Sequence, residues 1–334
     1  MPAGNAARPT ADLMNETKTT EEYAMEKCTI SVNARDRFST TAQCLETLLA
    51  NTPEPHDLIV VIGGAPERLK REWTETFGRK ARFIFRSEFL NQPQARNIGL
   101  REAKTRLAVL MDNDNFVRPG WLMALLECQR DTDAVIVVPV ILETPERIHT
   151  AGNSLYVSHI NGTAYGCKIL RCYGMRLGEQ SSLKREPTDY AELHCQLVQV
   201  EPTLRLGACD EHFVEVGEVD QGLTYAKAGL PMWFEPRSVV HYALGHRIAG
   251  EDIRLFEWRW NIKSIHDGYQ YFQRKWNMDV SEYGEFRDWL VGYNNQLGLL
   301  PRLWPTNLAL RLNGWIGTIR KTVLNAFRTP KQWY

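Results

Sequence analysis

The sequence predicts an α/β protein with a mainly parallel central sheet that helices cover on both faces. In residues 28–142, short apolar runs alternate with amphipathic stretches of helical period. The apolar runs lack a polar face, as expected for strands that are buried on both sides. This alternation favours a sheet whose ligand binds at the carboxyl ends of its strands.

The elements of this first half follow one another without interruption. Predicted strands occupy residues 28–32, 57–62, 82–86, 107–111 and 134–142. Predicted helices start near residue 39 and span residues 66–77, 94–104 and 119–130. Ser39 suits the N-cap of the first helix, because a serine hydroxyl can accept a hydrogen bond from the first helical turn.

The pattern changes after residue 142. The following segments are short, partly alternating and separated by turns, which predicts antiparallel hairpins: residues 148–157, 162–166 and 193–200. Residues 176–188 form a polar loop that could belong to an acceptor lid. A helix is predicted at 221–228, where Gly229 closes it.

Composition places the chain among ordinary globular proteins, with one large domain and an appendage. The 334 residues carry a formal net charge of zero, which argues against a nucleic-acid partner. Seven cysteines include no C-x-x-C pair, and no secretory leader is visible, so we expect reduced thiols and a cytoplasmic location. Any membrane contact should be peripheral, because no apolar run approaches the ~18 to 20 residues of a membrane span.

Two aspartates follow the fourth predicted strand, in the run Asp112-Asn-Asp114. If the chain stays extended there, residues two apart face the same side, and their carboxylates converge. Paired carboxylates suit Mg²⁺ or Mn²⁺, which complete their shells with water and with the phosphates of a ligand such as a nucleoside diphosphate. The alternative is an ordinary polar loop. A second copy, Asp131-Thr-Asp133, precedes a strand, so its location differs.

Glycine-rich phosphate loops are missing from the sequence. There is no G-x-G-x-x-G run and no Walker A lysine loop, and Gly63-Gly64 predicts only a tight turn. These absences disfavour a dinucleotide-binding enzyme and a P-loop enzyme.

The order of four stretches resembles that of family 2 type glycosyltransferases with the GT-A fold, over residues 28–245. The stretches are Asp36-Arg37 with Cys44-Leu-Glu-Thr-Leu48; Ala95-Arg-Asn-Ile-Gly99; Asp112-Asn-Asp114 with Pro119-Gly-Trp-Leu122; and Gly207-Ala-Cys-Asp-Glu211 with Gly217-Glu-Val-Asp220 and Ala228-Gly229. The resemblance implies a GT-A catalytic domain at 26–245. Residues 1–25 lack periodicity, which predicts a disordered tail, and residues 246–334 are predicted to form a C-terminal helical extension.

The resemblance assigns the metal site. Asp112 and Asp114 correspond to the D-x-D pair that holds Mn²⁺ or Mg²⁺ against the donor's diphosphate, where a dication stabilises the leaving group. His241, after another strand, resembles the histidine that some members supply as a further metal ligand. A histidine packed in the core is the alternative for His241.

The resemblance also places a catalytic acid. Glu218 stands where the family has the proton acceptor of an inverting transfer, although Gly217 replaces the first acid of the usual motif. Asp220 is the reserve candidate, and Asp210 and Glu211 could contact the acceptor. On the alternative interpretation, all four are solvated loop acids.

The donor's base is not assigned by the sequence. Members often carry an aspartate after the second strand, but here the run is Val60-Val-Ile-Gly-Gly64, so UDP, GDP and dTDP sugars all stay open. Asn33, Arg35 and Arg96 are candidate base and phosphate contacts, together with Asp112. Arg96 could instead be a surface charge on its helix.

The C-terminal segment lies outside the resemblance. Residues 251–276 have helical spacing, and we predict one helix packed on the domain. No acidic residue follows Trp289, while six basic residues do, around an amphipathic stretch that could lie on an anionic membrane or form a homodimer contact.

We therefore expect a metal-dependent, inverting transfer of a sugar from a nucleotide-sugar to a glycan, a lipid-linked acceptor or another hydroxyl acceptor. Two alternatives stay open. One is a nucleotidyltransferase acting on sugar phosphates, which would normally need a glycine-rich loop near the first strand. The other is a catalytically inactive sugar-nucleotide-binding protein.

Overall fold

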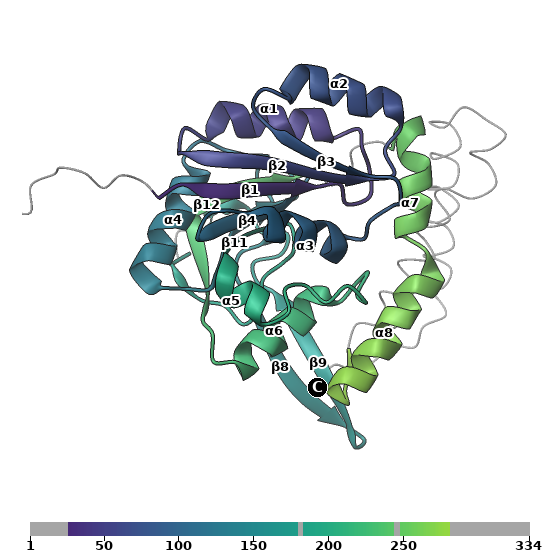
Figure 1. Cartoon of the computed structure of the whole chain (residues 1–334). Coiled ribbons are helices and arrows are strands. Elements are labelled where there is room, and N and C mark those ends of the chain that lie inside the picture. The colour runs from purple at the N-terminus through teal and green to yellow at the C-terminus, as the bar shows by residue number, and fades with distance from the viewer. Residues whose placement is uncertain (1–25, 180–182, 244–247, 281–334) are drawn as a thin grey trace, which may run out of the picture.

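The computed structural model describes residues 26–179, 183–243 and 248–280 (Figure 1). The predicted tail at 1–25 and the predicted membrane or dimer segment after Trp289 lie outside the described residues. No helix in the described ranges has the length and apolar character that crossing a membrane requires.

Ten strands form the central sheet. They are β1 (Cys28–Asn33), β2 (His56–Gly63), β3 (Arg82–Arg86), β4 (Leu107–Asp112), β5 (Asn115–Val117), β6 (Ile136–Leu142), β7 (Ile148–Thr150), β10 (Glu186–Pro187), β11 (Cys195–Gln199) and β12 (Met232–Tyr242). Their main order is β10-β12-β6-β11-β4-β1-β2-β3, with β5 beside β12 and β7 beside β6. The predicted mainly parallel α/β sheet is confirmed: β1 runs parallel to β2 and β4, β2 to β3, and β6 to β12.

In the middle of the sheet, β11 runs against this direction. It lies between β4 and β6 and is antiparallel to both. Its start therefore lies beside the carboxyl end of β4, and this pairing brings a later part of the chain to the end of the strand that carries Asp112.

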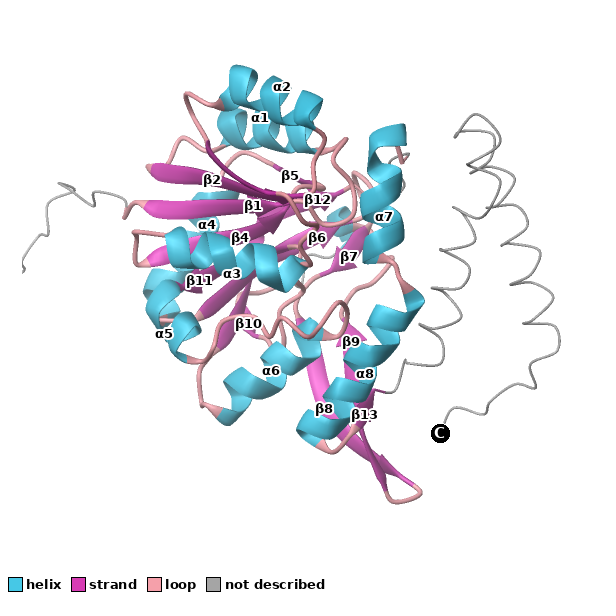
Figure 2. Ribbon diagram, turned by 45° about the vertical axis from the view of Figure 1, so that its right-hand side comes forward, coloured by secondary structure: helices cyan, strands magenta, loops and turns pink. Residues whose placement is uncertain are grey.

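Helices cover both faces of the sheet (Figure 2). On one face, α1 (Thr41–Asn51), α2 (Glu67–Phe77) and α4 (Trp121–Thr132) pack on a core that includes Val109 of β4. On the other, α3 (Gln92–Glu102), α5 (Val200–Arg205) and α6 (Gly217–Lys227) contact Ala108, Leu110 or their neighbours. Alternate residues of a strand point to opposite faces, so the continuous apolar run of β4 serves both cores.

Helix α3 lies directly on β1 because Gly99 has no side chain. A Cβ at this position would lie 1.8 Å from Oγ of Ser31. The helix begins two residues before the predicted start, since Asn91 and Gln94 form a capping box and Pro93 occupies the first turn. This close packing fixes the residues of α3 relative to the strand ends.

The second half of the chain adds a smaller sheet. It contains β8 (Asn153–Ile160), β9 (Thr163–Leu170) and β13 (Asp279–Val280), and β8 pairs with β9 as the predicted antiparallel hairpin. A 3₁₀ turn covers Leu177–Glu179 in the predicted polar loop. Helix α6 begins at Gly217, four residues before the predicted start, so Glu218 and Asp220 occupy its first turn. The helix dipole favours carboxylates there.

The predicted single helix at 251–276 is wrong, because two helices, α7 (Ile253–Arg259) and α8 (Ile262–Trp276), occupy this stretch. The first helix ends before Trp260, whose buried indole N–H donates a hydrogen bond to the Asp36 carboxylate at 3.1 Å. Asn261 then caps α8 by accepting a hydrogen bond from the Ser264 amide. A tertiary contact with a residue 224 positions away therefore overrides the helical period.

Asp252 fastens α7 to the loop after β1. Its buried carboxylate accepts hydrogen bonds from the amides of Phe38 and Ser39 and from the Ser39 hydroxyl. The predicted N-cap role of Ser39 is wrong for this reason, and α1 begins at Thr41 instead. Segment 248–280 therefore packs against the carboxyl ends of the first strands.

Candidate active site

Three buried side chains converge where β4 ends. Asp112 is the last residue of β4, Asp114 follows in the turn, and His194 directly precedes β11. One potential ligand atom from each lies within 4.8 Å of the others. The antiparallel pairing explains the meeting, because the Asp112 amide donates to the His194 carbonyl at 3.1 Å. We call these three residues the carboxylate–histidine cluster.

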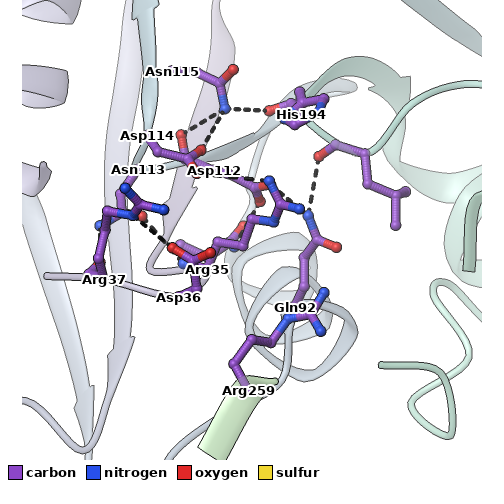
Figure 3. Close-up of polar contacts among 12 residues, drawn as sticks. Arg35, Asp36, Arg37, Gln92, Asp112, Asn113, Asp114, Asn115, His194 and Arg259 are labelled. Carbon is purple, nitrogen blue, oxygen red and sulfur yellow. Dashed lines mark hydrogen bonds and ion pairs between the residues drawn. The ribbon is translucent and has the colours of Figure 1, made fainter. Parts of the chain in front are cut away.

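Two asparagines hold the turn that shapes this cluster (Figure 3). Asn115 donates to the Asp112 carbonyl, to Oδ1 of Asp114 and to the His194 carbonyl. Asn113 donates to the Arg37 carbonyl and accepts from the Arg35 amide, which ties the loop after β1 to the turn. The chain turns after Asp112 instead of staying extended, yet the two carboxylates still converge.

Asp112 is fully paired. Its carboxylate accepts hydrogen bonds from Asn33 at 2.9 Å, Gln92 at 2.5 Å and Arg96 at 3.2 Å. Two predicted donor contacts, Asn33 and Arg96, thus touch the first aspartate directly. Arg96 is 1% exposed, so the alternative of a surface charge is wrong.

Asp114 is paired less completely. Its Oδ2 has no hydrogen-bond partner among the described residues, and Nη1 of Arg35 lies 3.8 Å away. Burial raises the pKa of Asp114 to about 7, Asp112 adds to the rise, and Arg35 opposes it. Burial and the charge of Arg35 lower the pKa of His194, so its imidazole is neutral.

These donors fit a divalent cation. The Oδ2 atom of Asp114 and the Nδ1 atom of His194 are buried and have no hydrogen-bond partner within the described ranges. Carboxylate oxygens and a neutral imidazole nitrogen are ligands that Mn²⁺ accepts, and a cation would relieve the repulsion between the two carboxylates.

A cavity of about 370 Å³ opens beside the cluster. Asp112 and His194 line it on one side, and Glu218 of α6 and Lys168 of β9 line it as well. Its volume falls in the ~300–1,000 Å³ range of small-molecule sites. We call it the central cavity.

Glu218 and Lys168 form an ion pair of 2.8 Å in the central cavity. Burial alone would raise the pKa of Glu218, but Lys168 more than offsets it, and the pKa is lowered. Glu192 lies nearby, and burial raises its pKa to about 7. The alternative that Glu218 is a solvated loop acid is wrong, because it is 7% exposed.

Asp220, Asp210 and Glu211 lie elsewhere. They line a second cavity of about 690 Å³, which shares Pro93, Leu193 and Gly217 with the first. Lys275 binds both Asp210 and Asp220, at 2.8 and 2.7 Å. Glu211 accepts a hydrogen bond from Asn97. Glu218 and Asp220 therefore point into different cavities from one helical turn.

His241 lies on β12 opposite Phe116 of β5, with the two rings 6.2 Å apart. The carboxylate–histidine cluster takes its imidazole from His194 instead, and no sequence motif marks that residue. Only the β11–β4 pairing reveals it.

Two further residues escaped sequence reasoning. Lys168 is one of several lysines in the chain, and only the hairpin brings it to Glu218. Arg259 ends α7, is 2% exposed and pairs with Glu215, and two of its nitrogens lack partners among the described residues (Figure 3). Its guanidinium lies 4.6 Å from the Trp260 ring.

Comparison with known protein families found a match. Residues 29–184 match the family model described as glycosyl transferase family 2. Over these residues, slightly under half of the chain, the protein is similar to family 2 glycosyltransferases, and its fold is of the GT-A type. The matched residues contain the β1 loop, the Asp112–Asp114 turn and Lys168, while His194, Glu218 and Arg259 lie beyond them.

A solved structure shares the fold at low identity. GalNAc-T7, solved with UDP, GalNAc and Mn²⁺, has a TM-score of 0.53 at 14% identity; the alignment covers 81% of this chain and 55% of that one, so this chain spans about half its length. The mannosyltransferase PcManGT from Pyrobaculum calidifontis, in complex with GDP-Man and Mn²⁺, has a TM-score of 0.48 at 16% identity, covering 91% and 76%. A comparison with curated protein sequences found no match.

Proposed function

We propose that this chain is a metal-dependent, inverting glycosyltransferase that moves a sugar from a nucleotide-sugar donor to a glycan, lipid-linked or other hydroxyl acceptor. One observation carries the proposal. The central cavity is lined both by members of the carboxylate–histidine cluster, Asp112 and His194, and by a buried carboxylate, Glu218. A transfer of this kind needs these two functions on either side of one sugar.

The cluster is the donor side. Asp112, Asp114 and His194 would hold Mn²⁺ or Mg²⁺, which would neutralise the charge that collects on the diphosphate as the bond to the sugar breaks. Arg35 and Arg259 also line the central cavity, and each has at least one buried guanidinium nitrogen without a hydrogen bond among the described residues. We assign them to the donor's phosphates, because arginine binds phosphate through several N–H groups at once.

Glu218 is the proton acceptor in this proposal. The acceptor's hydroxyl loses its proton as its oxygen attacks the anomeric carbon, and a carboxylate takes that proton. Lys168 keeps Glu218 ionised at neutral pH, since it lowers the pKa of the carboxyl. Asp220 stays the reserve base, and Asp210 and Glu211 stay candidate acceptor contacts in the neighbouring cavity.

The further metal role of His241 and the choice among UDP, GDP and dTDP donors belong to the same proposal. A screen of the three nucleoside diphosphates with Mn²⁺, read by thermal shift, identifies the base. In a nucleotidyltransferase, the sugar phosphate would attack a phosphorus atom of a nucleoside triphosphate and pyrophosphate would be released. Analysis of the products therefore separates it from a glycosyltransferase.

The central test measures transfer and hydrolysis with a panel of labelled nucleotide-sugars. We expect turnover that EDTA abolishes and added Mn²⁺ or Mg²⁺ restores. A protein that binds nucleotide-sugars but never releases sugar would instead be an inactive binding protein.

A matched pair of variants tests the metal ligands. In calorimetry, Asp114→Ala should bind UDP or GDP no better with Mn²⁺ than without it, because phosphate oxygens and Asp114 share one coordination shell. Asp131→Ala is the control: it removes an aspartate from the other D-x-D run, at the surface. Coupling that survives in Asp114→Ala removes the metal assignment.

The cellular site is part of the proposal, with a cytoplasmic location and membrane contact through residues after Trp289. Those residues lie outside the described ranges. Deleting 300–334 should abolish sedimentation with anionic liposomes, since each Lys or Arg near an anionic leaflet contributes about 1 kcal/mol. If the intact protein never binds liposomes and is dimeric, the segment is a homodimer contact.

A further inference from the structure

A second polar pair lies in the central cavity, and neither metal binding nor proton transfer uses it. Glu143 follows β6, and His149 is the middle residue of β7. The antiparallel pairing of β6 with β7, with Leu142 opposite Ile148, brings the two side chains together. Oε2 of Glu143 and Nδ1 of His149 are 3.7 Å apart, and both residues line the cavity.

Both atoms lack a partner. Neither Oε2 of Glu143 nor Nδ1 of His149 makes a hydrogen bond with any described residue, although both atoms are buried. The separation of 3.7 Å is too long for a hydrogen bond between them. Buried polar atoms without partners are unfavourable unless a ligand supplies the missing hydrogen bonds.

The pair lies between the two working parts of the cavity. The His149 ring is 5.2 Å from the ring of His194, a member of the carboxylate–histidine cluster. On the other side, Lys168 is close enough for its charge to act on His149, and Lys168 pairs with Glu218. The anomeric carbon of a donor sugar is bonded to the phosphate held at the metal, and the acceptor attacks this same carbon from the side of Glu218. His149 therefore lies beside the space that the sugar ring would occupy.

We propose that Glu143 and His149 bind adjacent hydroxyl groups on the sugar of the donor, and that this sugar is uncharged. The assignment rests on the proposed glycosyltransferase function and names its donor class. A carboxylate accepts from one hydroxyl, while an imidazole can donate to or accept from the next. Five carboxylates line this cavity (Asp112, Glu143, Glu192, Glu215 and Glu218), against three cationic side chains (Arg35, Lys168 and Arg259). Because the two arginines are assigned to the donor's phosphates, Lys168 is the cation left beside the sugar, and a sugar that carries its own carboxylate would be repelled.

Tyr173 completes the sugar site at the cavity mouth. Its ring meets the His149 ring edge-on at 5.9 Å and is 58% exposed. An aromatic ring of this kind offers an apolar wall to a sugar face. Hydroxyl-binding groups behind an aromatic wall are what a neutral pyranose requires.

Calorimetry tests the assignment with Mn²⁺ present throughout. The probes are UDP, GDP and dTDP, and for each base a neutral sugar-nucleotide (UDP-glucose, UDP-galactose, GDP-mannose, dTDP-glucose) and, as the charged comparison, UDP-glucuronate. In the unaltered protein, one neutral sugar-nucleotide should bind at least 10-fold more tightly than its parent diphosphate, and UDP-glucuronate should show no such gain.

Glu143→Gln and His149→Asn should each reduce that gain by about 10-fold and leave the affinity for the parent diphosphate unchanged within a factor of two. Unchanged diphosphate binding also shows that each variant is folded. Glu146→Gln on the same turn and His159→Gln on β8 are exposed, and these controls should keep the full gain.

Three results would overturn the assignment. The sugar gain could survive in both variants, with only the KM for the acceptor raised, which would make the pair an acceptor site. Affinity for the diphosphate could fall as much as that for the sugar-nucleotide, which would make the pair a support for the metal cluster. If the unaltered protein bound no nucleoside diphosphate at all, the proposed glycosyltransferase function would fail and this assignment with it.

Discussion

Residues 26–142 and residues 143–280 both supply side chains to the central cavity, but by different routes. In the first part, Asn33 and Asp112 end neighbouring parallel strands that pair residue for residue. In the second part, Lys168 comes from a hairpin, His194 from a turn and Arg259 from a break between helices. The carboxyl ends of parallel strands lie side by side at one edge of the sheet. Lys168, His194 and Arg259 reach the cavity only because distant segments of the chain pack together.

This contrast predicts different consequences for mutations in the two parts. Changes to the strand-end residues should remove a function that the sheet itself positions. In residues 143–280, each substitution should remove one contact. Conservative substitutions there can therefore change turnover, donor affinity, stability or pH dependence one at a time.

The largest effect is expected at Glu218. Glu218→Gln keeps the shape and removes the proton acceptor, so turnover should fall by roughly 10²- to 10⁴-fold with donor affinity unchanged. Steady-state kinetics with a labelled donor checks this. Asp220→Asn is the comparison, and it should be milder because Asp220 faces the second cavity. The opposite ranking would move the base by two residues.

The next effect concerns Arg259. Arg259→Met removes a buried guanidinium with two free nitrogens, and a charged hydrogen bond contributes about 1.5–3 kcal/mol, so affinity for UDP or GDP with Mn²⁺ should fall roughly 10- to 100-fold. Arg254→Met, at an exposed position of α7, should leave the affinity unchanged. Equal affinity in both variants would show that segment 248–280 takes no part in donor binding.

A stability effect is expected where the two parts are fastened. Asp252→Ala leaves the amides of Phe38 and Ser39 without their acceptor, which should lower the free energy of unfolding by about 1–3 kcal/mol. Urea unfolding measures the change, and Glu251→Ala serves as the neighbouring control. A loss no greater than that of the control would mean that the β1 loop is held by other contacts.

The smallest effect is a change in pH dependence. Lys168 lowers the pKa of Glu218, so the carboxyl is ionised, and able to act as a base, down to acidic pH. Lys168→Met should raise that pKa, and the acid side of the pH profile of kcat should move to higher pH. Turnover well above the new pKa should be retained. If the acid side of the pH profile does not move, a group other than Glu218 sets it.

The sequence predicted most of the fold and part of the site. The regular alternation of strands and helices in residues 28–142 is a local pattern, and the strand β3 was predicted to the residue. The Asp112–Asp114 pair was found because it ends a buried strand. His194 was missed because its position depends on the antiparallel β11–β4 pairing, which no local pattern encodes.

Helix placement accounts for the other differences. Glu218 and Asp220 were expected in a loop, but α6 begins at Gly217, and residues two apart on a helix face different directions. The predicted helix at 251–276 has a good helical period, and the contact between Trp260 and Asp36 interrupts it. In both cases the deciding interaction joins residues far apart in the sequence.

The Asp252 and Trp260 contacts have a consequence for how the protein can be shortened. The family match ends at residue 184, which suggests cutting the chain soon after the glycosyltransferase domain. Such a cut would strip the indole from the buried Asp36 carboxylate and the carboxylate from the amides of the β1 loop. Residues 252–260 therefore stabilise the loop at the carboxyl end of β1, and a shortened chain that keeps these contacts must extend at least past Trp260.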